Sequence, residues 1–95
     1  MKSLWLKKAD RDLDRIVGYI CTHFSKELAD LVVYKIKESV LHLESFPELG
    51  RKIGGHFHKR YLVVQGNTIM YEIVLNRTPV IIVRSIRPRK EFTAK

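Results

Sequence analysis

Residues 79–92 decide the fold of this chain and read Pro-Val-Ile-Ile-Val-Arg-Ser-Ile-Arg-Pro-Arg-Lys-Glu-Phe. The stretch opens with a β-branched run, residues 80–83, whose composition is typical of a strand buried on both faces. It then places four cations within seven residues: Arg84, Arg87, Arg89 and Lys90. The stretch therefore predicts a core strand that ends in a fixed cluster of positive charge at the edge of a sheet.

The net charge of +8 is confined to the second half of the 95-residue chain. Residues 1–50 contain eight Lys or Arg against eight Asp or Glu, whereas residues 51–95 contain ten against only Glu72 and Glu91. Such a segregated field steers a protein towards an acidic partner, namely nucleic acid, an acidic protein segment or a membrane surface. The length predicts a single domain, residues 1–95, with one modest core.

The cysteine content and the hydropathy pattern predict a soluble cytoplasmic protein. The one cysteine, Cys21, excludes an intramolecular disulfide, and its place beside an apolar stripe predicts a buried or boundary position. No run approaches the ~20 apolar residues of a membrane span, and the first residues lack the apolar core of a signal peptide. We therefore expect no membrane partner.

Two helices are predicted from the apolar spacing of the first half. Over residues 9–24 the apolar side chains recur every three or four positions and form one stripe. Acidic residues in its early turns suit the positive end of the helix dipole: Asp10, Asp12 and Asp14. Ser25 is expected to cap a second helix that ends near Ser45. Because the connection around Ser25 between the two helices is short, the helices are predicted to form an antiparallel hairpin.

The rest of the chain predicts a sheet beside this hairpin. Four strands are expected, at residues 3–7, 61–65, 68–75 and from 80 onward. Residues 46–57, with three glycines and a proline, are expected to form a long irregular connection. The predicted fold is α+β in the order β-α-α-β-β-β, with the N-terminal helical hairpin packed on an antiparallel sheet.

Two predicted turns fix a register for the last three strands. With turn centres at Gly66-Asn67 and Arg77-Thr78, Leu62 lies opposite Tyr71, and Tyr71 lies opposite Arg84. The face expected to receive the helices then carries Leu62, Val64, Ile69, Tyr71, Ile73, Leu75, Val80, Ile82 and Ile86. The accessible face carries, among others, Glu72, Ser85 and Arg87. A slip by one residue would exchange the two faces.

The candidate functional residues are cations. The sequence contains no phosphate-binding loop, no metal-ligand spacing of cysteine and histidine and no nucleophile elbow, so we expect no cofactor and no metal. His56 and His58 form an isolated pair without a second cluster. Arginine forks capture phosphate or carboxylate, which draws attention to Arg51, Lys52, Lys59, Arg60, Arg84, Arg87, Arg89 and Lys90. Glu48 and Glu72 are the candidate bases for RNA cleavage. Arg84 has an alternative structural role, as the partner of an acidic side chain from a helix.

Four segments of the chain, in order and suitably spaced, carry a family resemblance. They are Trp5-Leu6-x-x-Ala9-x-x-Asp12-Leu13-x-x-Ile16-x-x-Tyr19-Ile20, Phe46-Pro47-x-x-Gly50-Arg51, Arg60-Tyr61-Leu62-Val63 with Ile69-Met70-Tyr71-Glu72-Ile73, and Ile81-Ile82-Val83-Arg84-Ser85-Ile86-Arg87-Pro88-Arg89-Lys90. Together they resemble the RelE/ParE superfamily of toxins from bacterial type II toxin–antitoxin systems. The resemblance covers nearly the whole chain and implies the predicted β-α-α-β-β-β fold.

Two activities occur in that superfamily. RelE-like members are ribosome-dependent mRNA endoribonucleases that use basic residues and a C-terminal tyrosine or histidine, whereas ParE-like members inhibit DNA gyrase and block replication. A RelE-like site would be built from Arg60, Arg87, Arg89 and Glu72. Phe92 stands near the tyrosine position and Arg87 where a histidine often stands, so the ending is closer to ParE. The resemblance favours a gyrase inhibitor, with an mRNA endoribonuclease or an inactive antitoxin-binding relative as the alternatives.

The resemblance also implies surfaces for a target and for a cognate antitoxin. The expected target-binding residues are Arg84, Arg87, Arg89, Lys90 and Phe92, with gyrase as the target, or the ribosome and mRNA in the alternative. An acidic, partly disordered antitoxin segment would suit the basic half of the chain. Its expected contacts are Leu31, Val33 and Arg60. A homodimer and a toxin–antitoxin hetero-oligomer are both left open.

Overall fold

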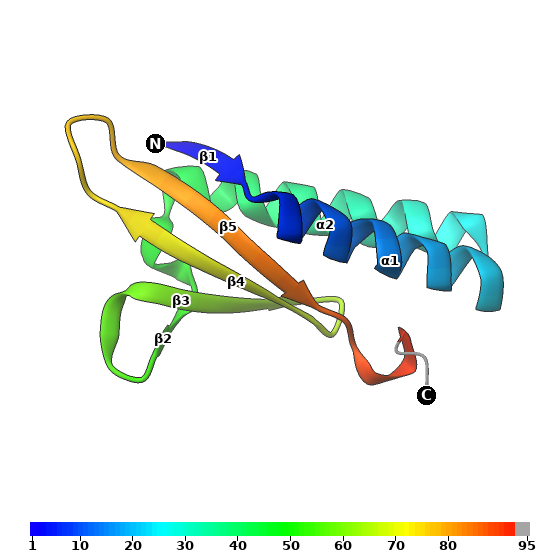
Figure 1. The fold of residues 1–95 in the computed structure, drawn as a ribbon. Coiled ribbons are helices and arrows are strands. Elements are labelled where there is room, and N and C mark those ends of the chain that lie inside the picture. Colours follow the sequence, from blue (N-terminus) through cyan, green and yellow to red (C-terminus); the bar gives the residue numbers. More distant parts are fainter. Residues whose placement is uncertain (93–95) are drawn as a thin grey trace.

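The computed structural model of the chain describes residues 1–92, in which two helices pack side by side on one face of a five-stranded sheet (Figure 1). The helices and strands are β1 (Lys2–Trp5), α1 (Lys7–His23), α2 (Lys26–Ser45), β2 (Arg51–Ile53), β3 (His56–Val64), β4 (Asn67–Val74) and β5 (Val80–Arg87). Two short 3-10 helices, Pro47–Leu49 and Lys90–Phe92, follow α2 and β5. The predicted α+β fold is confirmed.

The sheet has the strand order β1-β5-β4-β3-β2, and β5 and β4 lie near its middle. The pairs β5–β4, β4–β3 and β3–β2 are antiparallel, but β1 runs parallel to β5. The expectation of a purely antiparallel sheet is therefore wrong at one edge. The long stretch of chain between β1 and β5, which contains both helices and three strands, allows β1 to run either parallel or antiparallel to β5.

The helical hairpin follows the apolar stripes read from the sequence. Ser25 caps α2, with its side-chain oxygen accepting a hydrogen bond from the Leu28 amide at 3.0 Å. The buried side chains of the two helices are Ala9, Asp12, Leu13, Ile16, Ile20, Ala29, Val32, Ile36, Val40 and Leu43. Cys21 is exposed rather than buried, because it lies one position beyond the stripe that contains Ile20. No helix within residues 1–92 combines the length and the apolar character needed to cross a membrane.

The expected irregular connection at residues 46–57 is instead mostly structured. It contains the 3-10 helix Pro47–Leu49, the whole of β2 and the first residues of β3. Gly54 and Gly55 both have positive φ, at 55° and 78°, and make the tight turn between β2 and β3. The glycines that suggested a loop therefore mark the turn of an added hairpin.

The β3–β4 turn is centred one residue earlier than expected, on Gln65-Gly66, where both residues have positive φ. Such a pair suits the mirror-image turns that close two-residue hairpins. Leu62 consequently lies opposite Ile69 rather than Tyr71. Because moving a turn centre by one residue shifts the pairing by two, the side chains of β3 keep the faces predicted for them.

The β4–β5 connection differs more, because five residues, 75–79, replace the expected two-residue turn. The pairs Ile69–Ile86 and Tyr71–Val83 flank a β-bulge, so β5 contains one residue more than β4 in this region. Beyond the bulge, Ile81 and Val83 face the helices, and the predicted Val80 and Ile82 do not. The predicted faces are therefore right for β4 and the end of β5 and wrong for its beginning.

Candidate functional site

The end of β5 is held against α1 by a buried carboxylate. Asp12, inside the apolar stripe of α1, accepts a hydrogen bond from the Ile86 amide at 2.9 Å. Lys8, one helical turn earlier, makes an ion pair with the same carboxylate at 3.0 Å. Asp12 thus serves as a link between helix and strand, beyond the helix-dipole role expected of it, and it fixes the backbone directly before Arg87.

Asn67 fixes the segment that follows β5. Its side chain is fully buried, and its amide nitrogen donates to the carbonyls of Val64 and Gln65, each at 3.3 Å. Its side-chain oxygen accepts a hydrogen bond from the Arg89 amide at 2.9 Å. Across the same turn, a Cβ atom on Gly66 would lie 3.0 Å from the Cβ of Arg89. The β3–β4 turn and the basic segment therefore form one packed unit.

Phe92 closes this unit from the other side. Its ring is 4% exposed and meets the ring of Phe24 edge to face, with centroids 5.6 Å apart. The guanidinium carbon of Arg89 lies 4.8 Å from the Phe92 ring centroid, while Nη2 of Arg89 pairs with Glu91 at 2.8 Å. That hydrogen bond holds the pKa of Glu91 below its usual value. Phe92 is thus a core residue, and its ring is not presented to a target as the sequence led us to expect.

The remaining cations of the cluster lie at the surface of this anchored segment. Arg84 makes a 3.0 Å ion pair with Glu72 of the neighbouring strand β4, rather than with a helix. Arg87 and Lys90 are exposed, and neither has an ion-pair partner among residues 1–92. Charges held on a rigid backbone can meet an anionic surface without a large ordering cost.

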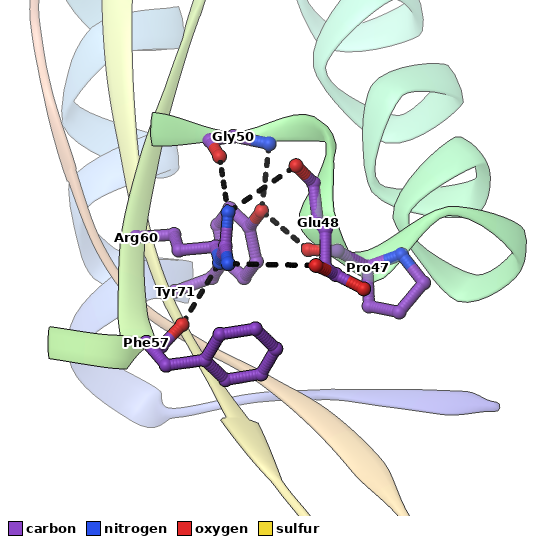
Figure 2. Close-up of polar contacts among 6 residues, drawn as sticks. All are labelled: Pro47, Glu48, Gly50, Phe57, Arg60 and Tyr71. Carbon is purple, nitrogen blue, oxygen red and sulfur yellow. Dashed lines mark hydrogen bonds and ion pairs between the residues drawn. The ribbon is translucent and has the colours of Figure 1, made fainter. Parts of the chain in front are cut away.

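Arg60 is 5% exposed and lies in a network of backbone carbonyls (Figure 2). Its Nε donates to the carbonyl of Phe57 at 2.9 Å, and its Nη1 donates to the carbonyls of Gly50 and Glu48 at 2.9 and 3.3 Å. Nη2 lies 3.9 Å from the exposed Glu48 carboxylate. The fork is therefore occupied by the protein's own backbone and ties the segment before β2 to β3.

Tyr71 completes the same network from β4 (Figure 2). Its hydroxyl donates to the carbonyl of Pro47 at 2.7 Å and accepts a hydrogen bond from the Gly50 amide at 2.9 Å. Burial raises the pKa of this hydroxyl above its usual value. A Cβ atom on Gly50 would lie 2.6 Å from both the Tyr71 hydroxyl and the Tyr61 carbonyl, so this close approach requires glycine. We call Arg60, Tyr71 and Gly50 the loop clamp.

The four residues of a RelE-like site do not come together. Arg60 lies opposite Tyr71 on the buried face of the sheet, whereas Glu72 points to the other face and pairs with Arg84. Arg87 lies opposite Thr68, four residues along β4 from Glu72. Of the two candidate bases, Glu72 stands apart from the buried arginine and only Glu48 lies near it, with its carboxylate 3.9 Å from Arg60 Nη2. The arginines themselves are spread over two faces.

The other predicted residues occupy separate places. Leu31 is 44% exposed on α2, but Val33 is partly buried against the core, and Arg60 is buried in the loop clamp. An antitoxin contact at Arg60 would therefore need the clamp to open. His56 and His58 are exposed on β3, and no group of three metal-binding side chains occurs among residues 1–92.

Comparison with known proteins finds a matching family profile and several similar solved structures. A profile of the family described as "ParE toxin of type II toxin-antitoxin system, parDE" matches residues 4–91. The solved structure described as "Chromosomal ParDE TA system from P. aeruginosa" contains a chain with 24% sequence identity and a TM-score of 0.74. The similarity covers 95% of this chain and 97% of that one, and it supports the fold. Among curated proteins, none matches the chain.

Proposed function

The chain belongs to the ParE toxin family of type II toxin–antitoxin systems, and we propose that it inhibits DNA gyrase and is neutralised by a cognate antitoxin. The proposed target-binding surface is the end of β5 and the basic segment that follows it, with Arg84, Arg87, Arg89 and Lys90. One observation carries the proposal: Arg87 and Lys90 are exposed on a segment anchored by Asn67 and Phe92, and neither has an ion-pair partner among residues 1–92. This arrangement suits binding to a target rather than cleavage of one.

The proposed antitoxin is an acidic segment that covers the same surface. Ten of the eighteen Lys and Arg residues lie within 51–95, against two Glu residues, so this half attracts a negatively charged chain. An antitoxin bound there would compete with gyrase for Arg87 and Lys90. Neutralisation would then be competitive and would weaken as salt screens the charges.

The test is a gyrase supercoiling assay with purified toxin, scored for loss of supercoiled plasmid and for trapped cleaved DNA. We expect the wild-type chain to inhibit, and Arg87→Ala with Lys90→Ala to raise the inhibitory concentration at least tenfold. Arg77→Ala, which removes one exposed charge from the β4–β5 loop, is the matched control and should inhibit normally. Undisturbed supercoiling at excess wild-type toxin would remove gyrase as the target.

A translation assay with a reporter mRNA separates the alternative activity. The scattered positions of Arg60, Arg87 and Glu72 give no support to ribosome-dependent cleavage, so the message should remain intact. Cuts within codons, abolished by Arg87→Ala, would instead assign the chain to the RelE-like activity.

A further inference from the structure

The outward faces of the two helices differ in chemistry. Within α1, all of which the structure describes, every large apolar side chain is buried or partly buried. By contrast, α2 exposes Leu31, Tyr34 and Leu41 at 44%, 60% and 61%. The core does not need these side chains, because α2 supplies a complete inner stripe from its opposite face. Single exposed apolar residues are ordinary, but three along one helix face form a stripe that water solvates poorly.

The two exposed leucines of α2 are placed symmetrically about the middle of the helix. Ile36 is fully buried, so the helix surface opposite it faces solvent. Leu31 precedes Ile36 by five residues and Leu41 follows it by five, while Tyr34 and Glu38 stand two residues to either side. At 1.5 Å per residue, Leu31 and Leu41 lie about 15 Å apart along the axis.

A face with this symmetry matches a second copy of itself that runs antiparallel. A two-fold axis at the level of Ile36 exchanges the two halves of the helix, so one patch serves both subunits. We propose that the outward face of α2 is the interface of a homodimer of this chain. Its two-fold axis brings Leu31 level with the partner's Leu41, and Tyr34 level with the partner's Glu38. The proposal is independent of gyrase inhibition.

Tyr34 is held in place for such a contact. Its hydroxyl donates to Glu38 Oε2 at 3.0 Å, and Glu38 also lies 4.0 Å from Lys35 Nζ. The hydrogen bond to Glu38 raises the pKa of Tyr34, which keeps the hydroxyl neutral. A tyrosine that is already fixed loses little side-chain entropy on binding, and a central aromatic residue is typical of an interface hot spot.

Charge favours a second copy over an acidic partner on this face. Residues 1–50, which contain both helices, carry eight positive and eight negative side chains, so this half adds no net repulsion between two copies, and the +8 charge of each chain resides in the other half. The same neutrality gives an acidic antitoxin segment no electrostatic attraction to α2, in contrast to the basic half of the chain. A single helix pair is a small interface, so the dimer is expected to be weak and dependent on concentration.

Sedimentation velocity on the purified chain tests the dimer with a charge-exchange design. The wild-type mass should rise from 11.2 kDa towards twice that value as the concentration increases. One double variant, Leu31→Glu with Leu41→Glu, and a second, Leu31→Lys with Leu41→Lys, should each remain monomeric. An equimolar mixture should dimerise again, because opposite charges come level across the two-fold axis. Leu75→Glu changes an exposed leucine outside α2 and should dimerise like wild type.

The restoration in the mixture is the decisive readout, because misfolding of either variant could not produce it. Circular dichroism of each variant verifies that the helices are intact. A wild-type chain that stays monomeric at about 1 mM, well above a micromolar dissociation constant, would overturn the proposal. Dimerisation of the unmixed charge variants would overturn it equally. Loss of antitoxin affinity without any change in self-association would assign the face to the antitoxin instead.

Discussion

Replacing Arg60 with lysine keeps the charge but removes the fork, and it should destabilise the fold. A lysine ammonium holds its three N–H donors on one nitrogen, whereas Arg60 uses two nitrogens to reach Phe57 and Gly50, so lysine can replace one of these two 2.9 Å bonds but not both. The 3.3 Å bond to Glu48 is lost as well. Two charge-assisted bonds at their lower value of about 1.5 kcal/mol each give a loss of about 3 kcal/mol in the free energy of unfolding.

Thermal and urea denaturation followed by circular dichroism measure this loss. For a domain of this size, 1 kcal/mol shifts Tm by about 4–8 °C, so Arg60→Lys should lower Tm by roughly 12–24 °C. Arg51→Lys makes the same exchange at an exposed neighbour and should change stability by less than about 0.5 kcal/mol. If the Tm of Arg60→Lys lies within about 2 °C of the Tm of Arg51→Lys, the loop clamp does not stabilise the segment before β2.

Three further outcomes follow from the same contacts. Asn67→Ala should speed hydrogen exchange at the Arg89 amide and weaken gyrase inhibition, whereas Asn67→Asp keeps the acceptor and should retain protection of that amide. The raised pKa of Tyr71 means that the folded state binds its proton more tightly, so stability should be full below pH ~10 and fall above it. Tyr71→Phe should flatten this alkaline loss in urea titrations at several pH values. Asp12→Ala leaves the Ile86 amide without an acceptor and should cost about 1–3 kcal/mol of unfolding free energy, measured by urea denaturation.

The helices were predictable because their apolar spacing is local, whereas the sheet depended on details that spacing does not encode. Ser25 was correctly predicted to cap α2. In the sheet, Ile69 and Ile86 pair as the predicted register requires. The bulge beyond them could not be seen in residues 80–83, because a continuous β-branched run looks the same on either face. The short strand β2 was missed because three residues carry no periodic signal.

The sequence identified the types of residue in the candidate site more accurately than it identified which of them are buried. Arg87 and Lys90 are exposed as expected, but Arg60 is buried. A signal for that burial was present, since Arg60 shares the alternation of Leu62 and Val64, which face the core. Likewise, a charged residue inside an apolar helix stripe, such as Asp12, indicates a buried polar partner. That partner, the Ile86 amide, is 74 positions away and could be identified only from the fold.

The two edge strands of the sheet are short, and this affects how the chain can self-associate. β1 has four residues and β2 has three, and the exposed side chains there include Lys2, Arg51 and Lys52. Short, positively charged edge strands offer few free backbone groups, and their charges repel the edge strands of a second copy. Strand-by-strand growth into fibrils is thereby disfavoured, and association through α2 would close at two copies instead of propagating.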